Sequence, residues 1–181
     1  MGAGRDPAVG RVNVDLAWWP GNQVAADVHC LPFRDSVAVE LNMSHVIEHI
    51  VAPLPVMAEL WRVARAGAML QIRVPYGSSD IAWTDPTHFR PFFAESWGVF
   101  AQPYHWRMEA NYVADWQPKT IVLLLNRENA GCTLVEAEER VKHERNVVRE
   151  MIVDLECVKP ARPAVKGTDV PAELSFELEG D

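Results

Sequence analysis

The sequence lacks a surplus of basic residues. Its 181 residues include 17 Lys and Arg against 25 Asp and Glu, so the formal net charge at pH 7 is -8. A general binder of nucleic acid or of an anionic membrane surface needs basic side chains to neutralise phosphates. The charge therefore argues against both kinds of partner for the molecule as a whole.

Long apolar runs and paired cysteines are also missing. No run approaches the ~18 residues of a membrane span, and the N-terminus shows no secretory signal pattern. Cys30, Cys132 and Cys157 are odd in number and widely spaced, without a C-x-x-C pair. Free thiols in a reducing compartment are the simplest interpretation, so we expect a cytoplasmic protein without a membrane partner.

What is present fits an α/β domain. Hydrophobic residues make up 49% and charged residues 23% of the chain, the balance of an ordinary globular protein. In the first hundred residues, short apolar runs alternate with segments of helical spacing. We expect strands over 11–16, 23–28, 37–44 and 68–75, and a helix over 53–66 that Gly67 ends.

The C-terminal half predicts further strands over 120–126 and 146–158. The segment 133–144 fits either a helix or part of a long hairpin, and its pattern favours the helix. Several prolines after Lys159 predict an extended tail. We therefore expect one domain over residues 1–158 and a tail over 159–181.

Alternating strands and helices imply a Rossmann-like, mostly parallel sheet with helices on both faces, here with an antiparallel C-terminal strand pair. Ligands of such sheets bind beyond the carboxyl ends of the strands. Asp15, Asp27, Ser44 and the segment after Pro75 all lie at such ends. This convergence predicts a ligand site there.

The stretch NMSHVIEHIVAP contains the pattern H-x-x-E-H, which also occurs in zinc proteases. On a helix, His45 and His49 would lie one turn apart and could bind one metal ion, with Glu48 as the general base. A zinc hydrolase would need a third ligand, for which Glu109 and Glu136 are candidates.

A second interpretation of this stretch involves no metal. Pro53 and Pro55 limit the helix to about two turns, and Ser44 is placed as its N-cap. Glu48 and His49 would then anchor the short helix to its neighbours. We favour this interpretation and expect no metal site.

A long loop over residues 76–100 follows the strand that ends at Pro75. Loops of this length in a compact domain are usually functional. Within it, Asp85 and His88 are candidates for a general base, set among several aromatic side chains. The alternative is structural: Asp85 caps a turn, and His88 and Arg90 hold the loop by hydrogen bonds.

Six ordered segments together resemble a class I S-adenosylmethionine-dependent methyltransferase of the methyltransferase type 11 kind. The resemblance covers roughly residues 1 to 100. The segments are GAGRDP, VNVDL, ADVHCLPFRDS, SHVIEHI, ELWRVARAGAMLQIRVP and DPTHFRPF. It implies S-adenosylmethionine as cofactor and methyl transfer as the activity.

The resemblance also implies roles for individual residues. Gly2 and Gly4 would form the glycine turn beside the cofactor, and Asp15, followed by Leu16, would accept hydrogen bonds from the ribose hydroxyls. Asp27 would bind the adenine amino group. The remaining cofactor contacts would be Val28 and His29 at the adenine ring, and Ser44 and His45 near the methionine end.

One departure from the family matters more than the rest: the sequence begins at the glycine turn, so the first strand of the family's sheet is missing. A different chain start, a strand from a second copy or an assembly partner, or a family member without activity would each explain this. The main alternative to the enzyme is therefore an inactive methyltransferase-like binding or assembly module.

The methyl acceptor is not identified by any motif. A small molecule or glycan-type acceptor is what the resemblance suggests. A nicotinamide-binding Rossmann enzyme would also fit an acid after the second strand, but it explains neither ADVHCLPF nor the DPTH loop.

Overall fold

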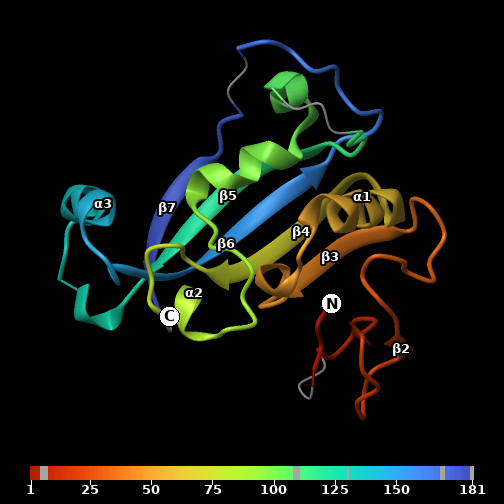
Figure 1. Ribbon diagram of the computed structural model, residues 1–181, viewed down its shortest axis with the longest axis horizontal. Coiled ribbons are helices and arrows are strands. Elements are labelled where there is room, and N and C mark those ends of the chain that lie inside the picture. Colours follow the sequence, from red (N-terminus) through yellow and green to blue (C-terminus); the bar gives the residue numbers. More distant parts are fainter. Residues whose placement is uncertain (5–7, 108–110, 130, 168–169, 180–181) are drawn as a thin grey trace.

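A five-stranded mixed sheet organises the chain. The computed structural model describes residues 1–4, 8–107, 111–129, 131–167 and 170–179 (Figure 1). In sheet order the strands are β3 (Ala38–Ser44), β4 (Ala64–Pro75), β6 (Val148–Cys157), β5 (Trp116–Leu125) and β7 (Glu173–Leu178). Because β6 pairs antiparallel with both β4 and β5, it runs against the other four strands. The predicted mixed α/β sheet with an antiparallel C-terminal pair is confirmed.

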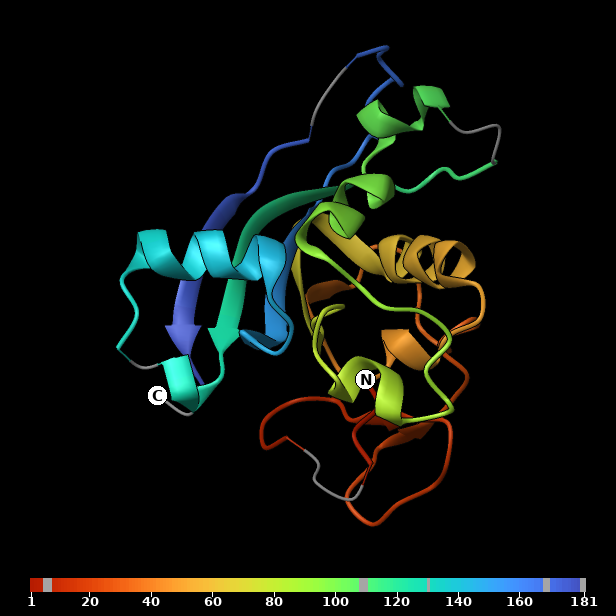
Figure 2. The ribbon, with the colours of Figure 1, turned by 60° about the vertical axis from the view of Figure 1, so that its left-hand side comes forward.

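One face of this sheet is apolar and covered. Alternate side chains of β4 and β6, among them Leu70, Ile72 and Val153, are fully buried. Helix α1 (Pro53–Val63) and the 3-10 helix η2 (Ala94–Phe100) lie over this face (Figure 2). The buried indole of Trp116 on β5 donates to the Met57 carbonyl of α1 at 2.9 Å, which ties the helix to the sheet.

The opposite face is polar. Gln71 of β4 donates to Asp154 of β6 at 3.1 Å, and Thr120 of β5 donates to the same carboxylate at 2.8 Å. Asn42 of β3 extends the row by donating to Gln71 at 3.1 Å. The sequence predicts helices on both faces of the sheet, but α1 and η2 lie on the same face. The side chains of the other face alternate along each strand with the buried ones, and their polar groups suit contact with water.

The first two strands form a separate small sheet. β1 (Val14–Asp15) and β2 (Val24–Ala25) pair in parallel and are shorter than the predicted runs over 11–16 and 23–28. Among the described residues, no strand connects this pair to β3. Figure 1 shows the N-terminal segment between them, where the Met1 amino group donates to the Asn42 carbonyl of β3.

The remaining helices are short. They are η1 (Ile47–His49), α2 (Ile81–Thr84), η3 (Gln102–Arg107), η4 (Arg127–Asn129) and α3 (Leu134–His143). The helix predicted over 133–144 is confirmed as α3, which begins with reciprocal hydrogen bonds between Thr133 and Glu136. No helix in the described part of the chain has the length and apolar character to cross a membrane.

The predicted end of the helix at Gly67 is wrong. Helix α1 ends at Val63, and β4 begins directly at Ala64. Gly67 lies within β4 with φ +75, in an irregularity where the pairing partner of β3 jumps from Ala64 to Met69. Its positive φ serves this bulge, which lengthens the strand N-terminally beyond the predicted 68–75.

The predicted tail contributes a strand. After Lys159 the sequence predicts an extended segment, but residues 173–178 form β7, which pairs in parallel with β5. Arg162 anchors the intervening stretch, because its guanidinium donates to the fully buried carboxylate of Asp115 at 2.7 and 2.8 Å.

Candidate functional site

A glycine turn at the N-terminus contacts the carboxyl ends of two strands, β1 and β3. Gly2 and Gly4 have positive φ values of +66 and +53, a conformation that glycine adopts without strain. The Gly4 amide donates to the Asp15 carboxylate at 2.9 Å. A Cβ on Gly2 would lie 2.1 Å from the Val46 side chain, just beyond β3. The turn therefore brings the ends of β1 and β3 together.

Asp15 holds this turn by hydrogen bonds, and its carboxylate oxygens can still accept further hydrogen bonds. One carboxylate oxygen accepts from Gly4, and the other accepts from the Ala17 amide at 2.9 Å. Each oxygen has two lone-pair sites, so one on each remains for a ligand hydroxyl. The neighbouring Leu16 is 76% exposed and can contact a bound group.

Asp27, Val28 and His29 form a turn after β2. One Asp27 oxygen accepts from the His29 amide at 2.9 Å and from its Nδ1 at 2.7 Å. The hydrogen bonds from His29, first the backbone and then the side chain, hold the pKa of Asp27 below its usual range. Both side chains are about half exposed. The acid is thus ionised, and its second oxygen is available to a donor.

The predicted helix start at Ser44 is wrong. Ser44 belongs to β3, and η1 begins at Ile47 without a side-chain cap. His45 has φ +51, so residues 45–49 are not one continuous helix. His45 and His49 therefore do not share a helical face as the zinc protease pattern requires.

His45 lies between two carboxylates. Its Nδ1 is 3.4 Å from Glu48 Oε1, and its Nε2 is 3.7 Å from Oε1 of Glu150 on β6. Glu48 and then the charge of Glu150 raise the pKa of His45, against the effect of burial. Glu150 also accepts from Arg73 of β4. Sequence reasoning missed Glu150, whose approach to His45 depends on the pairing of β4 with β6.

The loop after β4 docks against η1. The Phe89 amide donates to the Glu48 carbonyl at 2.8 Å, and Arg90 donates to the Val51 carbonyl. Asp85 accepts from the Thr87 hydroxyl at 2.7 Å and from its amide at 2.8 Å. These bonds, the side chain first, hold the pKa of Asp85 low. The structural interpretation of Asp85 and Arg90 fits this geometry, and a carboxylate of low pKa is a poor general base.

Docking of the loop brings His88 to His49. The two rings meet edge to face with centroids 4.7 Å apart. One ligand atom from each of Glu48, His49 and His88 lies within 4.8 Å of the others. The zinc hypothesis named other third ligands: Glu136 instead caps α3, and Glu109 lies outside the described residues.

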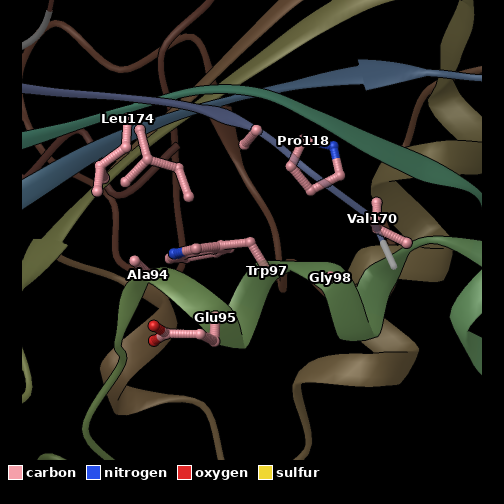
Figure 3. A pocket seen from close by; sticks show the side chains of 9 residues that line it. Ala94, Glu95, Trp97, Gly98, Pro118, Val170 and Leu174 are labelled. Carbon is pink, nitrogen blue, oxygen red and sulfur yellow. The ribbon is translucent and has the colours of Figure 1, made fainter. Parts of the chain in front are cut away.

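A separate apolar pocket lies between η2, β5 and the start of β7. Figure 3 shows Trp97 on its floor, fully buried, with an indole N–H that has no hydrogen-bond partner among the described residues. The other lining residues are Ala94, Glu95, Gly98, Pro118, Ile121, Val170, Ala172 and Leu174. No predicted site residue lines this pocket.

Comparison with known proteins gives structural likeness without sequence likeness. No protein-family model matches the chain, and no curated protein matches its sequence. A SAM-dependent methyltransferase from Archaeoglobus fulgidus superposes with a TM-score of 0.49 at 12% identity, over 68% of this chain and 61% of that protein. A mutant 16S rRNA (adenine(1408)-N(1))-methyltransferase from Catenulisporales acidiphilia gives 0.47 at 16%, over 78% and 61%.

A third solved structure is a geranyl diphosphate methyltransferase in complex with GPP and sinefungin. It superposes with a TM-score of 0.43 at 13% identity, over 75% of this chain and 52% of that one. The chain thus spans about half to three fifths of the length of these three proteins. At such identities and TM-scores the likenesses do not assign an activity.

Proposed function

We propose that this chain binds S-adenosylmethionine at the carboxyl ends of β1, β2 and β3 and transfers its methyl group to an acceptor. The observation that carries the proposal is the glycine turn, which touches Asp15 at one strand end and Val46 beyond another. A turn without side chains allows close approach of a ligand, and an acid beside it accepts ribose hydroxyls.

The neighbouring residues support this placement. Asp27 and His29 are about half exposed at the end of β2, in a position suited to the adenine group. Ser44 and His45 follow at the end of β3, where the methionine part of the cofactor would lie. The solved structures similar to this chain include methyltransferases, one of them with sinefungin bound.

A small molecule or glycan-type compound is the acceptor that we propose. The loop over 76–100 presents exposed aromatic rings, with Trp83 at 60%, Phe89 at 58% and Phe93 at 38% exposure. Exposed rings that cluster on one loop suit stacking against an apolar or sugar-like ligand. The net charge of -8 disfavours a nucleic acid acceptor.

Isothermal titration with S-adenosylmethionine and with its demethylated product tests the proposal. We expect 1:1 binding that Asp15→Ala weakens about 10- to 100-fold, because a hydrogen bond to a charged group contributes ~1.5–3 kcal/mol. Asp27→Ala, at an exposed position, should act in the same direction. Glu138→Ala, at an exposed position of α3, is the matched control and should leave binding unchanged.

The second candidate function is an inactive binding or assembly module. It is favoured by the separation of β1 and β2 from the main sheet and by the local hydrogen bonds that Asp15 and Asp27 already make. A folded protein that binds neither S-adenosylmethionine nor its product at millimolar concentration would support the module and refute the enzyme.

A further inference from the structure

We propose that Glu48, His49 and His88 bind a divalent transition-metal ion. The three come from two elements far apart in sequence: η1 supplies Glu48 and His49, and the docked loop supplies His88. This site differs from the one that the H-x-x-E-H pattern suggested, because His88 takes the place of His45. It does not depend on the proposed methyl transfer.

Glu48 is the first argument for a cation. Its side chain is 2% exposed, and neither carboxylate oxygen has a hydrogen-bond partner among the described residues. The nearest cationic group that the structure records is the half-exposed ring of His45, whose Nδ1 lies 3.4 Å from Glu48 Oε1 and whose pKa Glu48 raises. A buried carboxylate without donors is strongly destabilising unless a cation or a proton compensates it.

The orientation of His49 is the second argument. Its Nδ1 lies 2.9 Å from the Thr87 hydroxyl and 3.3 Å from the Thr87 carbonyl. That hydroxyl donates to Asp85 at 2.7 Å, so it accepts from His49, and Nδ1 carries the proton. In the neutral ring, Nε2 is then a lone pair available to a metal. A carboxylate and a hydroxyl behind a histidine are the kind of outer contacts that orient metal ligands.

His88 follows the same pattern. Its Nδ1 lies 3.1 Å from the Ala82 carbonyl, which can only accept, so Nδ1 again carries the proton. Its Nε2 is left as a lone pair, 3.9 Å from Asp85 Oδ2. Each ring thus uses Nδ1 for a local hydrogen bond and keeps Nε2 for a metal, and a ligand atom of each of the three side chains lies within 4.8 Å of the others.

The spacing admits a metal ion after a small contraction. Bonds of 2.0–2.2 Å place neighbouring ligand atoms about 3.4 Å apart in a tetrahedral site. The three ligand atoms lie within 4.8 Å of one another, so each needs to move inward by at most about 0.8 Å. The His88 side chain is only 10% exposed, but His49 is not buried, so ions and water can reach the site from the side of His49.

The donor set selects the class of metal. Imidazole nitrogens suit Zn²⁺ and Fe²⁺, whereas Mg²⁺ and Ca²⁺ prefer sites made of oxygen atoms. Two histidines and one carboxylate also leave at least one coordination position for water or an oxygen ligand. We therefore expect Zn²⁺ to bind much more tightly than Mg²⁺.

The test is metal titration of the full chain, stripped with chelator and without any methyl donor present. We expect one Zn²⁺ per chain by calorimetry, and one Co²⁺ with visible absorption bands of a low-coordinate site. His49→Ala and His88→Ala should each weaken Zn²⁺ binding more than about 100-fold, because even loss of an outer-shell contact costs 10–100-fold. Thr87→Val, which removes the hydroxyl behind His49, should cost about 10- to 100-fold.

Two variants separate this site from its alternatives. His45→Ala should retain Zn²⁺ binding; loss of Zn²⁺ binding in this variant would show that His45 belongs to the metal site and would overturn the proposed set of ligands. His143→Ala removes an exposed histidine 3.1 Å from Glu139 and should leave binding unchanged. Glu48→Gln should abolish binding, and if that variant fails to fold, the two histidine variants decide.

Three outcomes would overturn the proposal: no Zn²⁺ or Co²⁺ binding to the folded wild-type chain, binding that His49→Ala and His88→Ala leave intact, or tighter binding of Mg²⁺ than of Zn²⁺. Because no cofactor is added, failure of S-adenosylmethionine binding leaves this result unaffected.

Discussion

At the scale of single residues, the contact between Asp115 and Arg162 fixes the C-terminal segment to the sheet. The Asp115 side chain is fully buried, and it accepts from the Arg162 guanidinium, the Arg162 amide and the Gln102 amide. Burial alone would raise the pKa of Asp115, but the hydrogen bonds from Arg162 and Gln102 outweigh it and lower the pKa.

We expect Arg162→Ala to lower the free energy of unfolding by about 3 kcal/mol, because it leaves a buried carboxylate without its cation. Urea unfolding followed by circular dichroism measures the change. Arg145→Ala is the matched control: Arg145 and Asp80 form an exposed pair, and such pairs contribute ~1 kcal/mol or less. Equal effects of the two substitutions would contradict a special role of Arg162.

The same contact predicts a pH dependence. Because the folded pKa of Asp115 is below its ordinary value of 3.8, the stabilisation is fully present above that value and is lost as pH falls through the folded pKa. The Asp115→Asn variant should therefore lose less stability than wild type as pH falls below about 4. A parallel loss in both proteins would refute the assignment.

At the scale of elements, β7 closes one side of the sheet. It covers the edge of β5 along six residue pairs, from Thr120–Glu173 to Leu125–Leu178. We expect deletion of residues 172–181 to lower the free energy of unfolding by at least ~2 kcal/mol, because several ladder hydrogen bonds of about 0.5–1.5 kcal/mol each are lost.

The deletion should also cause concentration-dependent association in size-exclusion chromatography, because an unpaired β5 edge can pair with another chain. Phe176→Ala keeps the backbone of β7 and serves as the control; it should remain monodisperse if the wild type is. An unchanged unfolding midpoint after deletion would show that β7 does not support the sheet.

The elements differ in how far their sequences predict them. The strands over 37–44, 120–126 and 146–158 and the helix over 133–144 were predictable, because their apolar periodicity reflects burial of one face. The strand β7 was not, since its residues 173–178 are mostly polar or exposed and its pairing is made with a distant strand. The bulge at Gly67 likewise depends on the fit of β4 to β3.

At the scale of the whole molecule, the β1–β2 pair and the five-stranded sheet meet at the glycine turn, and they differ in how many strand pairings hold them. The β1–β2 pair holds a few local hydrogen bonds, such as Ala26 amide to Asp15 carbonyl at 2.9 Å, whereas β4 and β6 lie in the middle of a five-stranded sheet. Local opening free energies follow such differences in burial and pairing.

We therefore expect the amides of Val24 and Ala26 to exchange with solvent hydrogen at least ~100-fold faster than those in the β4–β6 ladder. Saturation with S-adenosylmethionine should slow exchange in β1 and β2 and leave the central ladder unchanged. Hydrogen–deuterium exchange followed by mass spectrometry measures both effects. Equal protection of the two parts in the free protein would contradict this division.

Asp15, Asp27 and Ser44 are candidates from the sequence because each stands at the carboxyl end of a predicted strand, and the chain direction alone assigns such ends to one edge of a parallel sheet. The roles proposed for Gly2, Gly4, Asp15 and Asp27 remain predictions that the titrations test. The position of His45 between Glu48 and Glu150 was not predictable, since it requires β6 to lie beside β4.

By itself, the sequence determined much of the local order: the main strands of the sheet, the helix over 133–144, and which polar residues stand near strand ends. Only the tertiary structure decided which side chains meet. His88 reaches Glu48 and His49 because the loop that carries it docks on η1 through the Phe89 amide. Such contacts join residues about forty positions apart, and a periodic pattern records burial of a face but not the partner that covers it.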